Sequence, residues 1–216
     1  MKKCFSPEFT HYKQSLRVVD FLERDGQGLN LTYEVRDGIL NHTGSCMANT
    51  LEGVVVKYPD RIAYVNHDLD DAFFGGVLSK NDIPKHLAAI FCEDGSDRID
   101  TMVNAVIEAS VDQPRIAMTA EIEEAMNEMR DYLDERVYQG SPAKIEEYKG
   151  EALLCRLFEY YVAHPEELPA FFRAHIEDEG KERMVCDYIA GMTDQFAIRT
   201  YQRLFIPEVW KGKSRD

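Results

Sequence analysis

The sequence predicts an all-α protein, and three features of its 216 residues lead to that prediction. Apolar residues recur every three or four positions along nearly the whole chain, which is the spacing of one helix face. No sustained stretch alternates apolar and polar residues in the manner of a half-buried strand. Ser or Thr precedes several of the apolar runs and glycines follow others, as at helix ends. We therefore expect helices joined by short connections.

Two short helices are expected first. One covers residues 7–23, and Gly26 and Gly28 follow it as helix-ending residues. Thr32 can cap the second helix, because its hydroxyl can accept a hydrogen bond from a backbone N–H of the first turn. This second helix is expected to stop near Gly44.

The third helix is expected over residues 51–74, with Thr50 as its N-cap and Gly75 after its last turn. Pro59 should kink this helix or split it in two, because proline has no backbone N–H to donate. The apolar stripe of the helix consists of Leu51, Val54, Val55, Ile62, Val65, Leu69 and Ala72.

Six further helices are expected in the rest of the chain. They span residues 82–92, 97–111, 119–138, 142–162, 166–178 and 181–204. Ser96, Thr119 and Ser141 are the expected N-caps of three of them, and Pro142 stands at a first helical position. Acidic residues are dense over 121–135, which usually indicates a solvated helix face that serves as scaffold.

The composition argues against several classes of function. Lys and Arg number 25 against 39 Asp and Glu, so the formal charge of −14 opposes a broad surface for nucleic acid or anionic membrane. No stretch approaches the roughly 18 apolar residues of a membrane span, and no signal peptide is evident. The five cysteines are widely spaced without a CxxC pair, which predicts neither a disulfide framework nor a zinc knuckle. We expect a soluble, cytoplasmic protein with reduced thiols.

The polar face of the third helix is the most informative feature of the sequence. At the helical rotation of about 100° per residue, five polar side chains share one arc opposite the apolar stripe. They are Asp60, Tyr64, His67, Asp68 and Asp71. Such a face is more often solvated than functional. Carboxylate and imidazole also suit Mn²⁺, Fe²⁺ or Mg²⁺, but other elements would have to add ligands, because one helix face cannot surround an octahedral ion.

Four segments of the chain resemble the dGTP triphosphohydrolase family, whose members are HD-domain dNTP triphosphohydrolases. The segments cover residues 9–19 (FTHYKQSLRVV), 28–39 (GLNLTYEVRDGI), 60–72 (DRIAYVNHDLDDA) and 185–194 (VCDYIAGMTD). They occur in the family's order, so the resemblance covers nearly the whole chain. It implies part of an all-α, HD-domain-like helical bundle in residues 1–80 and a C-terminal helical region in residues 81–216.

The resemblance also implies a reaction and a cofactor. Family members hydrolyse a dNTP to deoxynucleoside and intact triphosphate. A divalent ion (Mn, Mg or Fe) is held there by a His, a His-Asp pair and a later Asp, which Asp60 matches. The other ligands lie upstream of the segment that begins at Phe9, so we expect this chain alone not to retain the metal. The dipeptide His67-Asp68 follows Asp60 on the same helix and is not the motif that names the superfamily.

The resemblance assigns substrate contacts to further residues. Arg61 is expected near the triphosphate, Tyr64 against the sugar, and Asp68 at the 3′-hydroxyl. These roles are chemically sound, because a guanidinium neutralises phosphate charge and a ring against the sugar disfavours a 2′-hydroxyl. His11 matches a catalytic His that approaches the phosphates, although Tyr12 stands where the family usually has Asn.

The roles of several other residues are open to two interpretations. Tyr188 and Asp194 line the nucleotide pocket by resemblance, but their helix otherwise indicates core. His42 either caps a helix C-terminus or faces the site. Three cations either add positive charge near a triphosphate or form surface salt bridges: Lys13, Arg17 and Lys57.

Two functional hypotheses follow. In the first, the chain is part of a metal-dependent dNTP triphosphohydrolase. In the second, it is a catalytically incomplete helical remnant that binds nucleotides or oligomerises. A homo-oligomer is expected in both cases, because family members assemble and because an incomplete domain exposes apolar helix faces.

Overall fold

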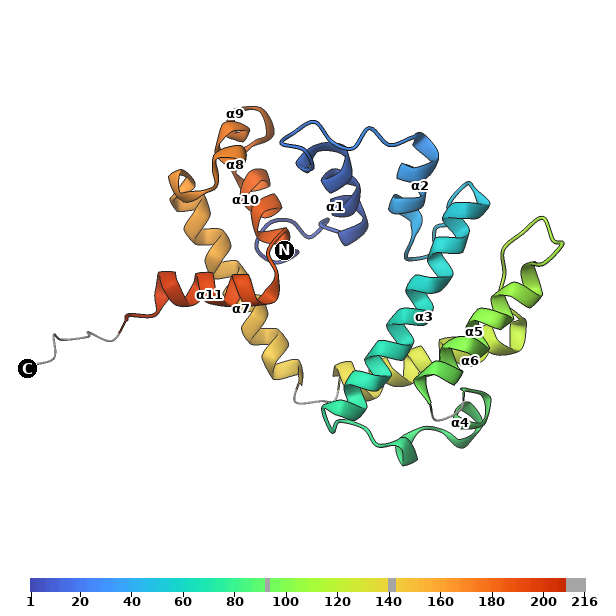
Figure 1. The fold of residues 1–216 in the computed structure, drawn as a ribbon. Coiled ribbons are helices and arrows are strands. Elements are labelled where there is room, and N and C mark those ends of the chain that lie inside the picture. The colour runs from blue at the N-terminus through green and yellow to red at the C-terminus, as the bar shows by residue number, and fades with distance from the viewer. Residues whose placement is uncertain (92–93, 140–142, 209–216) are drawn as a thin grey trace, which may run out of the picture.

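The computed structural model describes residues 1–91, 94–139 and 143–208, and every regular element within these ranges is helical (Figure 1). The all-α prediction is confirmed. The α-helices are α1 (His11–Arg17), α2 (Tyr33–Asn41), α3 (Leu51–Phe74), α4 (Lys85–Phe91), α5 (Gly95–Ser110), α6 (Ala120–Leu133), α7 (Ala143–Ala163), α8 (Ala170–Ala174), α9 (Ile176–Glu179), α10 (Lys181–Ala190) and α11 (Asp194–Phe205). Shorter π and 3₁₀ turns lie at Val18–Leu22, Lys80–Asp82, Asp134–Gln139 and Pro165–Glu167.

Helix α3 has the bounds that the sequence predicts, and Thr50 caps it by accepting a hydrogen bond from the Gly53 backbone N–H at 3.2 Å. The helix runs unbroken through Pro59, so the expected split does not occur. Tyr58 and Ile62 are buried on either side of the exposed proline. Tertiary packing therefore holds the helix together despite the missing backbone hydrogen bond.

Two predicted helix starts are wrong. Helix α1 begins at His11 and not at residue 7, because the preceding residues form turns, in one of which the Phe9 N–H donates to the Ser6 carbonyl at 3.0 Å. Helix α5 is capped by Asp94, whose carboxylate accepts from the Ser96 backbone N–H at 2.8 Å. Ser96 is therefore a residue of the first turn and not the cap.

Two predicted helices near the C-terminus are each divided. Pro169 cannot donate a backbone hydrogen bond, and the expected helix over 166–178 becomes a 3₁₀ turn followed by α8 and α9. The expected helix over 181–204 ends at Gly191 and restarts at Thr193, whose hydroxyl accepts from the Phe196 N–H at 3.2 Å. Thr32 and Thr119 precede their helices as predicted, without a side-chain cap bond. The expected cap Ser141 and its neighbour Pro142 lie outside the described residues.

The apolar side chains form two clusters. The first joins α3, α4, α5 and α6, and its most deeply buried members include Leu69, Leu87, Phe91, Met102, Met126, Met129 and Leu133. The second lies among α7, α10 and α11 and includes Leu157, Tyr161, Val185, Cys186 and Ile189. The N-terminal residues Met1, Cys4, Phe5 and Phe9 pack against this second cluster, and Figure 1 shows the N-terminus beside α10. The division of the chain at residue 80 stays a prediction.

A buried carboxylate joins the N-terminal helix to the C-terminal helices. The Asp187 side chain on α10 is fully buried and accepts hydrogen bonds from Gln14 Nε2 at 2.8 Å and Arg17 Nε at 2.7 Å. Arg183 donates to the same carboxylate. Arg17 also pairs with Glu179 at 2.8 Å. Opposite charge and several donors compensate the desolvation of this carboxylate, which fixes α1 against α10.

Helices α2 and α3 cross at two glycines. A Cβ placed on Gly38 would lie 3.5 Å from the Gly53 Cα, and a Cβ on Gly53 would lie 2.5 Å from the Ala48 Cβ. Both glycines are buried. Because glycine has no side chain, the backbones of α2 and α3 approach closely at these two positions. The segment that joins α2 to α3 is thereby held over the first turns of α3.

The substitution Gly53→Ala is expected to lower the free energy of unfolding by about 1–3 kcal/mol, because the added methyl group overpacks the α2–α3 crossing. Gly150→Ala is the matched control. Gly150 is also helical, but a Cβ there meets nothing within 4 Å. This second change should stabilise by about 0.5–1 kcal/mol through helix propensity. Urea unfolding of both variants measures the difference, and equal effects would contradict the close crossing.

Candidate nucleotide-binding site

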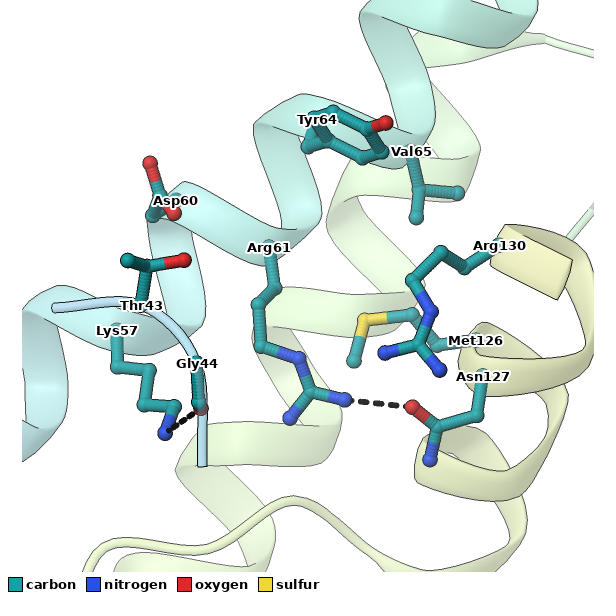
Figure 2. Close-up of a pocket in the computed structure, with 10 residues that line it drawn as sticks. All are labelled: Thr43, Gly44, Lys57, Asp60, Arg61, Tyr64, Val65, Met126, Asn127 and Arg130. Carbon is teal, nitrogen blue, oxygen red and sulfur yellow. Dashed lines mark hydrogen bonds between the residues drawn. The ribbon is translucent and has the colours of Figure 1, made fainter. Parts of the chain in front are cut away.

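A cavity of about 430 Å³ lies between α3, α6 and the segment that follows α2 (Figure 2). It is lined by Thr43, Gly44, Lys57, Asp60, Arg61, Tyr64, Val65, Met126, Asn127 and Arg130. Three residues predicted as site residues, Asp60, Arg61 and Tyr64, are therefore brought together. Tyr64 is 48% exposed, whereas Ile62 on the opposite face of α3 is 5% exposed. The predicted apolar stripe is buried from Ile62 to Ala72, but its members Leu51 and Val55 in the first turns of α3 are exposed, so the prediction is wrong for these two.

The cavity carries more positive than negative charge. Arg61 from α3 and Arg130 from α6 bring guanidinium groups into the same space (Figure 2). Arg61 donates to Asn127 Oδ1 at 2.7 Å and pairs at 3.4 Å with Glu123. The lining holds three cations, including Lys57, and one carboxylate, Asp60. Arg130 pairs with Asp131 at 3.0 Å, so both guanidinium groups have a carboxylate partner outside the lining. In a chain with a net charge of −14, a lining with more cations than carboxylates still suits a polyanionic ligand that competes for these arginines.

Lys57 shapes one wall of the cavity and is not a surface residue. Its ammonium is part-buried and donates to the backbone carbonyls of Gly44 and Cys46, each at 2.7 Å. On the other side of this segment, Asp37 accepts from the Asn49 backbone N–H at 2.6 Å. The residues between α2 and α3 are therefore fastened at both ends, and Thr43 is held at the rim of the cavity.

Tyr138 links two predicted substrate-binding residues. Its ring is stacked on the Tyr64 ring, with centroids 6.3 Å apart and planes at 20°. Its hydroxyl donates to the Asp68 carboxylate. Burial, together with this hydrogen bond to an anion, raises the pKa of Tyr138 well above its ordinary value, so the phenol stays protonated. Asp68 is therefore connected to the cavity through Tyr138.

Sequence reasoning missed several of these residues. Asn127 and Arg130 lie in the acid-rich run over 121–135, where composition indicates only a solvated face. Tyr138 lies just beyond that run, in the π-helical turn. Met126 is the sequence signal nearest to them, because an apolar residue at this position indicates that this side of α6 is covered. The pattern within α6 does not show which helix covers it, and so does not show that the next turn of α6 faces Arg61.

His11 is not among the residues that line this cavity. It is exposed at the start of α1, and its ring centroid is 5.3 Å from that of His42. His42 is the C-cap residue of α2, and its Nδ1 is 2.6 Å from the Ile39 carbonyl oxygen, which agrees with the capping interpretation. His42 also lines a second, mainly apolar cavity of about 640 Å³ between α2 and α3, together with Val35 and Val56. The role predicted for His11 stays a prediction.

Tyr188 and Asp194 lie in the C-terminal part of the fold. The Tyr188 ring contacts Tyr161 and Phe172, each with centroids 5.2 Å apart, as part of the second hydrophobic cluster. Asp194 begins α11 and lines a different cavity, beside Ala197. Neither lines the cavity that contains Asp60, and their substrate-binding roles stay predictions.

The described residues do not fit a complete divalent-metal centre. Within residues 1–91, 94–139 and 143–208, no group of three or more His, Cys, Asp or Glu side chains is arranged to hold an ion. Asp60 offers one carboxylate, and a divalent cation needs several ligands at once.

Within the described residues, no helix combines the length and apolar character needed to cross a membrane.

Comparison with known proteins identifies the class to which the chain belongs. Residues 116–203 match the model of the phosphohydrolase-associated domain. A deoxyguanosinetriphosphate triphosphohydrolase-like protein of Caldanaerobacter subterraneus subsp. tengcongensis is 47% identical over 97% of this chain and 62% of its own length. Proteins with the same name from Clostridium perfringens and Desulfatibacillum aliphaticivorans are 42% and 40% identical, over 93% and 96% of this chain and 61% and 64% of their own lengths.

Residues 116–203 are thus similar to a domain associated with phosphohydrolases. The chain as a whole is a homologue of the deoxyguanosinetriphosphate triphosphohydrolase-like proteins, as the four motifs of the sequence indicate. The chain spans about three fifths of the length of the relatives from Caldanaerobacter and Clostridium.

Replacing Lys57 by Met should loosen the wall of the cavity. The change keeps the side-chain length but leaves the Gly44 and Cys46 carbonyls without their donor, which costs about 1–3 kcal/mol. We expect the backbone amide of Asn49, which donates to Asp37 in the same segment, to exchange hydrogen at least about tenfold faster, as measured by mass spectrometry. Lys85→Met, at an exposed position of α4, is the control and should leave this exchange unchanged. Unaltered exchange in Lys57→Met would contradict the role of Lys57.

Proposed function

We propose that this chain is part of a dNTP triphosphohydrolase, which cleaves a deoxynucleoside triphosphate to deoxynucleoside and triphosphate. One observation carries the proposal. Asp60, Arg61 and Tyr64, which match family residues for metal, phosphate and sugar, line a single cation-rich cavity. Homology to proteins named for this reaction supports the proposal.

In this proposal the triphosphate binds between α3 and α6. The Arg61 guanidinium, now bonded to Asn127, exchanges this neutral amide for phosphate oxygens, which are stronger acceptors because they are charged. Arg130 adds a second guanidinium from the facing helix. The volume of about 430 Å³ suits a ligand of nucleotide size.

The sugar binds at the other end of the cavity. Tyr64 offers a half-exposed ring face, and Asp68 offers a carboxylate that can accept a hydrogen bond from the 3′-hydroxyl. In the structure Tyr138 contacts both groups, with its ring on Tyr64 and its hydroxyl on Asp68. A bound sugar must therefore either displace Tyr138 or bind Tyr64 and Asp68 beside it. Asp60 would contribute one carboxylate to the metal that the family uses, with further ligands from outside the described residues.

A second candidate function is nucleotide binding without hydrolysis. It is favoured by the finding that the described residues contain no group of three metal ligands. The cation-rich cavity does not depend on those ligands, so binding can persist without cleavage. Self-association and a cytoplasmic location remain predictions under both candidates.

The substitution Arg61→Gln should weaken the binding of dGTP by roughly 10- to 150-fold, since hydrogen bonds to a charged partner contribute about 1.5–3 kcal/mol each. Isothermal titration of the 216-residue protein measures the effect. Arg199→Gln is the control, because Arg199 is exposed on α11 and does not line the cavity. Equal affinities of the two variants would show that the nucleotide binds elsewhere.

Triphosphate release separates the two candidate functions. The 216-residue protein is extended by an upstream segment that contains a His and a His-Asp pair, because its described residues do not complete a metal centre. The longer protein is incubated with dGTP and Mn²⁺, and the products are resolved by ion-exchange chromatography. Binding together with release of intact triphosphate is the result expected of the enzyme. Binding without release supports the second function, and a protein that neither binds nor cleaves any of the four dNTPs contradicts both.

A further inference from the structure

The N-terminal segment lies along one face of α7. Lys3 Nζ is 2.5 Å from a Glu151 carboxylate oxygen, and the Phe5 and Phe158 ring centroids are 6.1 Å apart. Positions 151, 155 and 158 are spaced by four and three residues, so they share one side of the helix. The residue between Lys3 and Phe5 is Cys4, and the middle position on α7 is Cys155. The contacts on both sides therefore place these two cysteines opposite each other.

The two thiols also influence each other's ionisation. The Cys4 thiol contributes to the raised pKa of Cys155, and both residues are partly exposed. Cys186, in contrast, is fully buried in the second hydrophobic cluster, and Cys46 is exposed in the segment between α2 and α3. Of these four cysteines, Cys4 and Cys155 thus combine proximity to each other with access to a reagent in solution.

We propose that Cys4 and Cys155 form a redox-sensitive pair, which a low-molecular-weight disulfide such as oxidised glutathione converts to an intramolecular disulfide. One protein thiolate attacks the reagent's disulfide, forms a mixed disulfide and releases one glutathione thiolate. The second protein thiolate then attacks the mixed disulfide and releases the other glutathione. Two protein thiols lose their hydrogens and are oxidised by two electrons, and the reagent is reduced to two thiols.

The surroundings of Cys155 reduce its reactivity as a nucleophile. Burial, together with the nearby Cys4 thiol, raises the pKa of the Cys155 thiol to about 11. Little Cys155 thiolate is therefore present at neutral pH, and attack by this thiol becomes faster as the pH rises toward that value.

The disulfide would fasten the beginning of the chain to α7 across a separation of 151 residues. Residues 1–9 lead directly into α1, which the buried Asp187 carboxylate holds on α10. A covalent link so close to this anchor restricts the detachment of α1 and reduces the entropy of the unfolded chain. The oxidised protein should therefore melt at a higher temperature than the reduced one, by roughly 5–10 °C.

Peptide mapping under non-reducing conditions tests the pair. The 216-residue protein is treated with oxidised glutathione at pH 8.5, the remaining thiols are alkylated, and proteolytic peptides are identified by mass spectrometry. We expect a cross-linked peptide that joins Cys4 to Cys155, while the exposed Cys46 carries a glutathione adduct and reports that the reagent is active. Cys4→Ser should abolish both the cross-link and the rise in melting temperature, whereas Cys46→Ser should leave both unchanged.

Two outcomes would overturn the inference. One is recovery of Cys4 and Cys155 only as separate adducts or free thiols when Cys46 is fully modified. The other is a cross-link from Cys4 to Cys186, which would place the N-terminal segment differently on the second cluster. The wild-type map decides between these results even if a variant fails to fold.

Discussion

Burial of one face of α3 is the constraint on which the candidate site depends. Ile62 and Leu69 are held in the first hydrophobic cluster, so the side chains across the helix have only one direction in which to project. Turning α3 by one residue would carry a charged side chain such as Arg61 into the core, which costs several kcal/mol when no partner is present. The position of Arg61 and Tyr64 in the cavity is therefore a consequence of core packing.

A series of contacts connects this cavity to the distant C-terminal helices. The buried Asp187 carboxylate holds α1 on α10, and the chain passes from α1 into α2. Helix α2 then crosses α3 at Gly38 and Gly53, and the segment after α2 forms the rim of the cavity, where Lys57 fastens it. Asp187, within the motif over 185–194, is therefore joined to the cavity motif through contacts between helices, although Tyr188 and Asp194 do not line the cavity.

Sequence periodicity predicted the helical class, the bounds of α3 and the two faces of its second half, because each depends on local spacing and on which side chains avoid water. In the first turns of α3 the apolar side chains of Leu51 and Val55 are exposed, which periodicity did not predict. It failed at the first helix and at residues 166–178, where Pro169 and the packing of Phe9 on a distant cluster override local propensity. It also failed to find Asn127 and Arg130, because their function depends on which helix α6 faces. That pairing is a tertiary contact that no spacing within α6 encodes.

Binding of phosphate and sugar between α3 and α6 is tested most directly by a crystal structure of this protein with a non-hydrolysable dGTP analogue. We expect phosphate oxygens within hydrogen-bonding distance of both Arg61 and Arg130, with the deoxyribose against Tyr64. A nucleotide bound in the apolar cavity between α2 and α3, with Arg61 still bonded to Asn127, would contradict it.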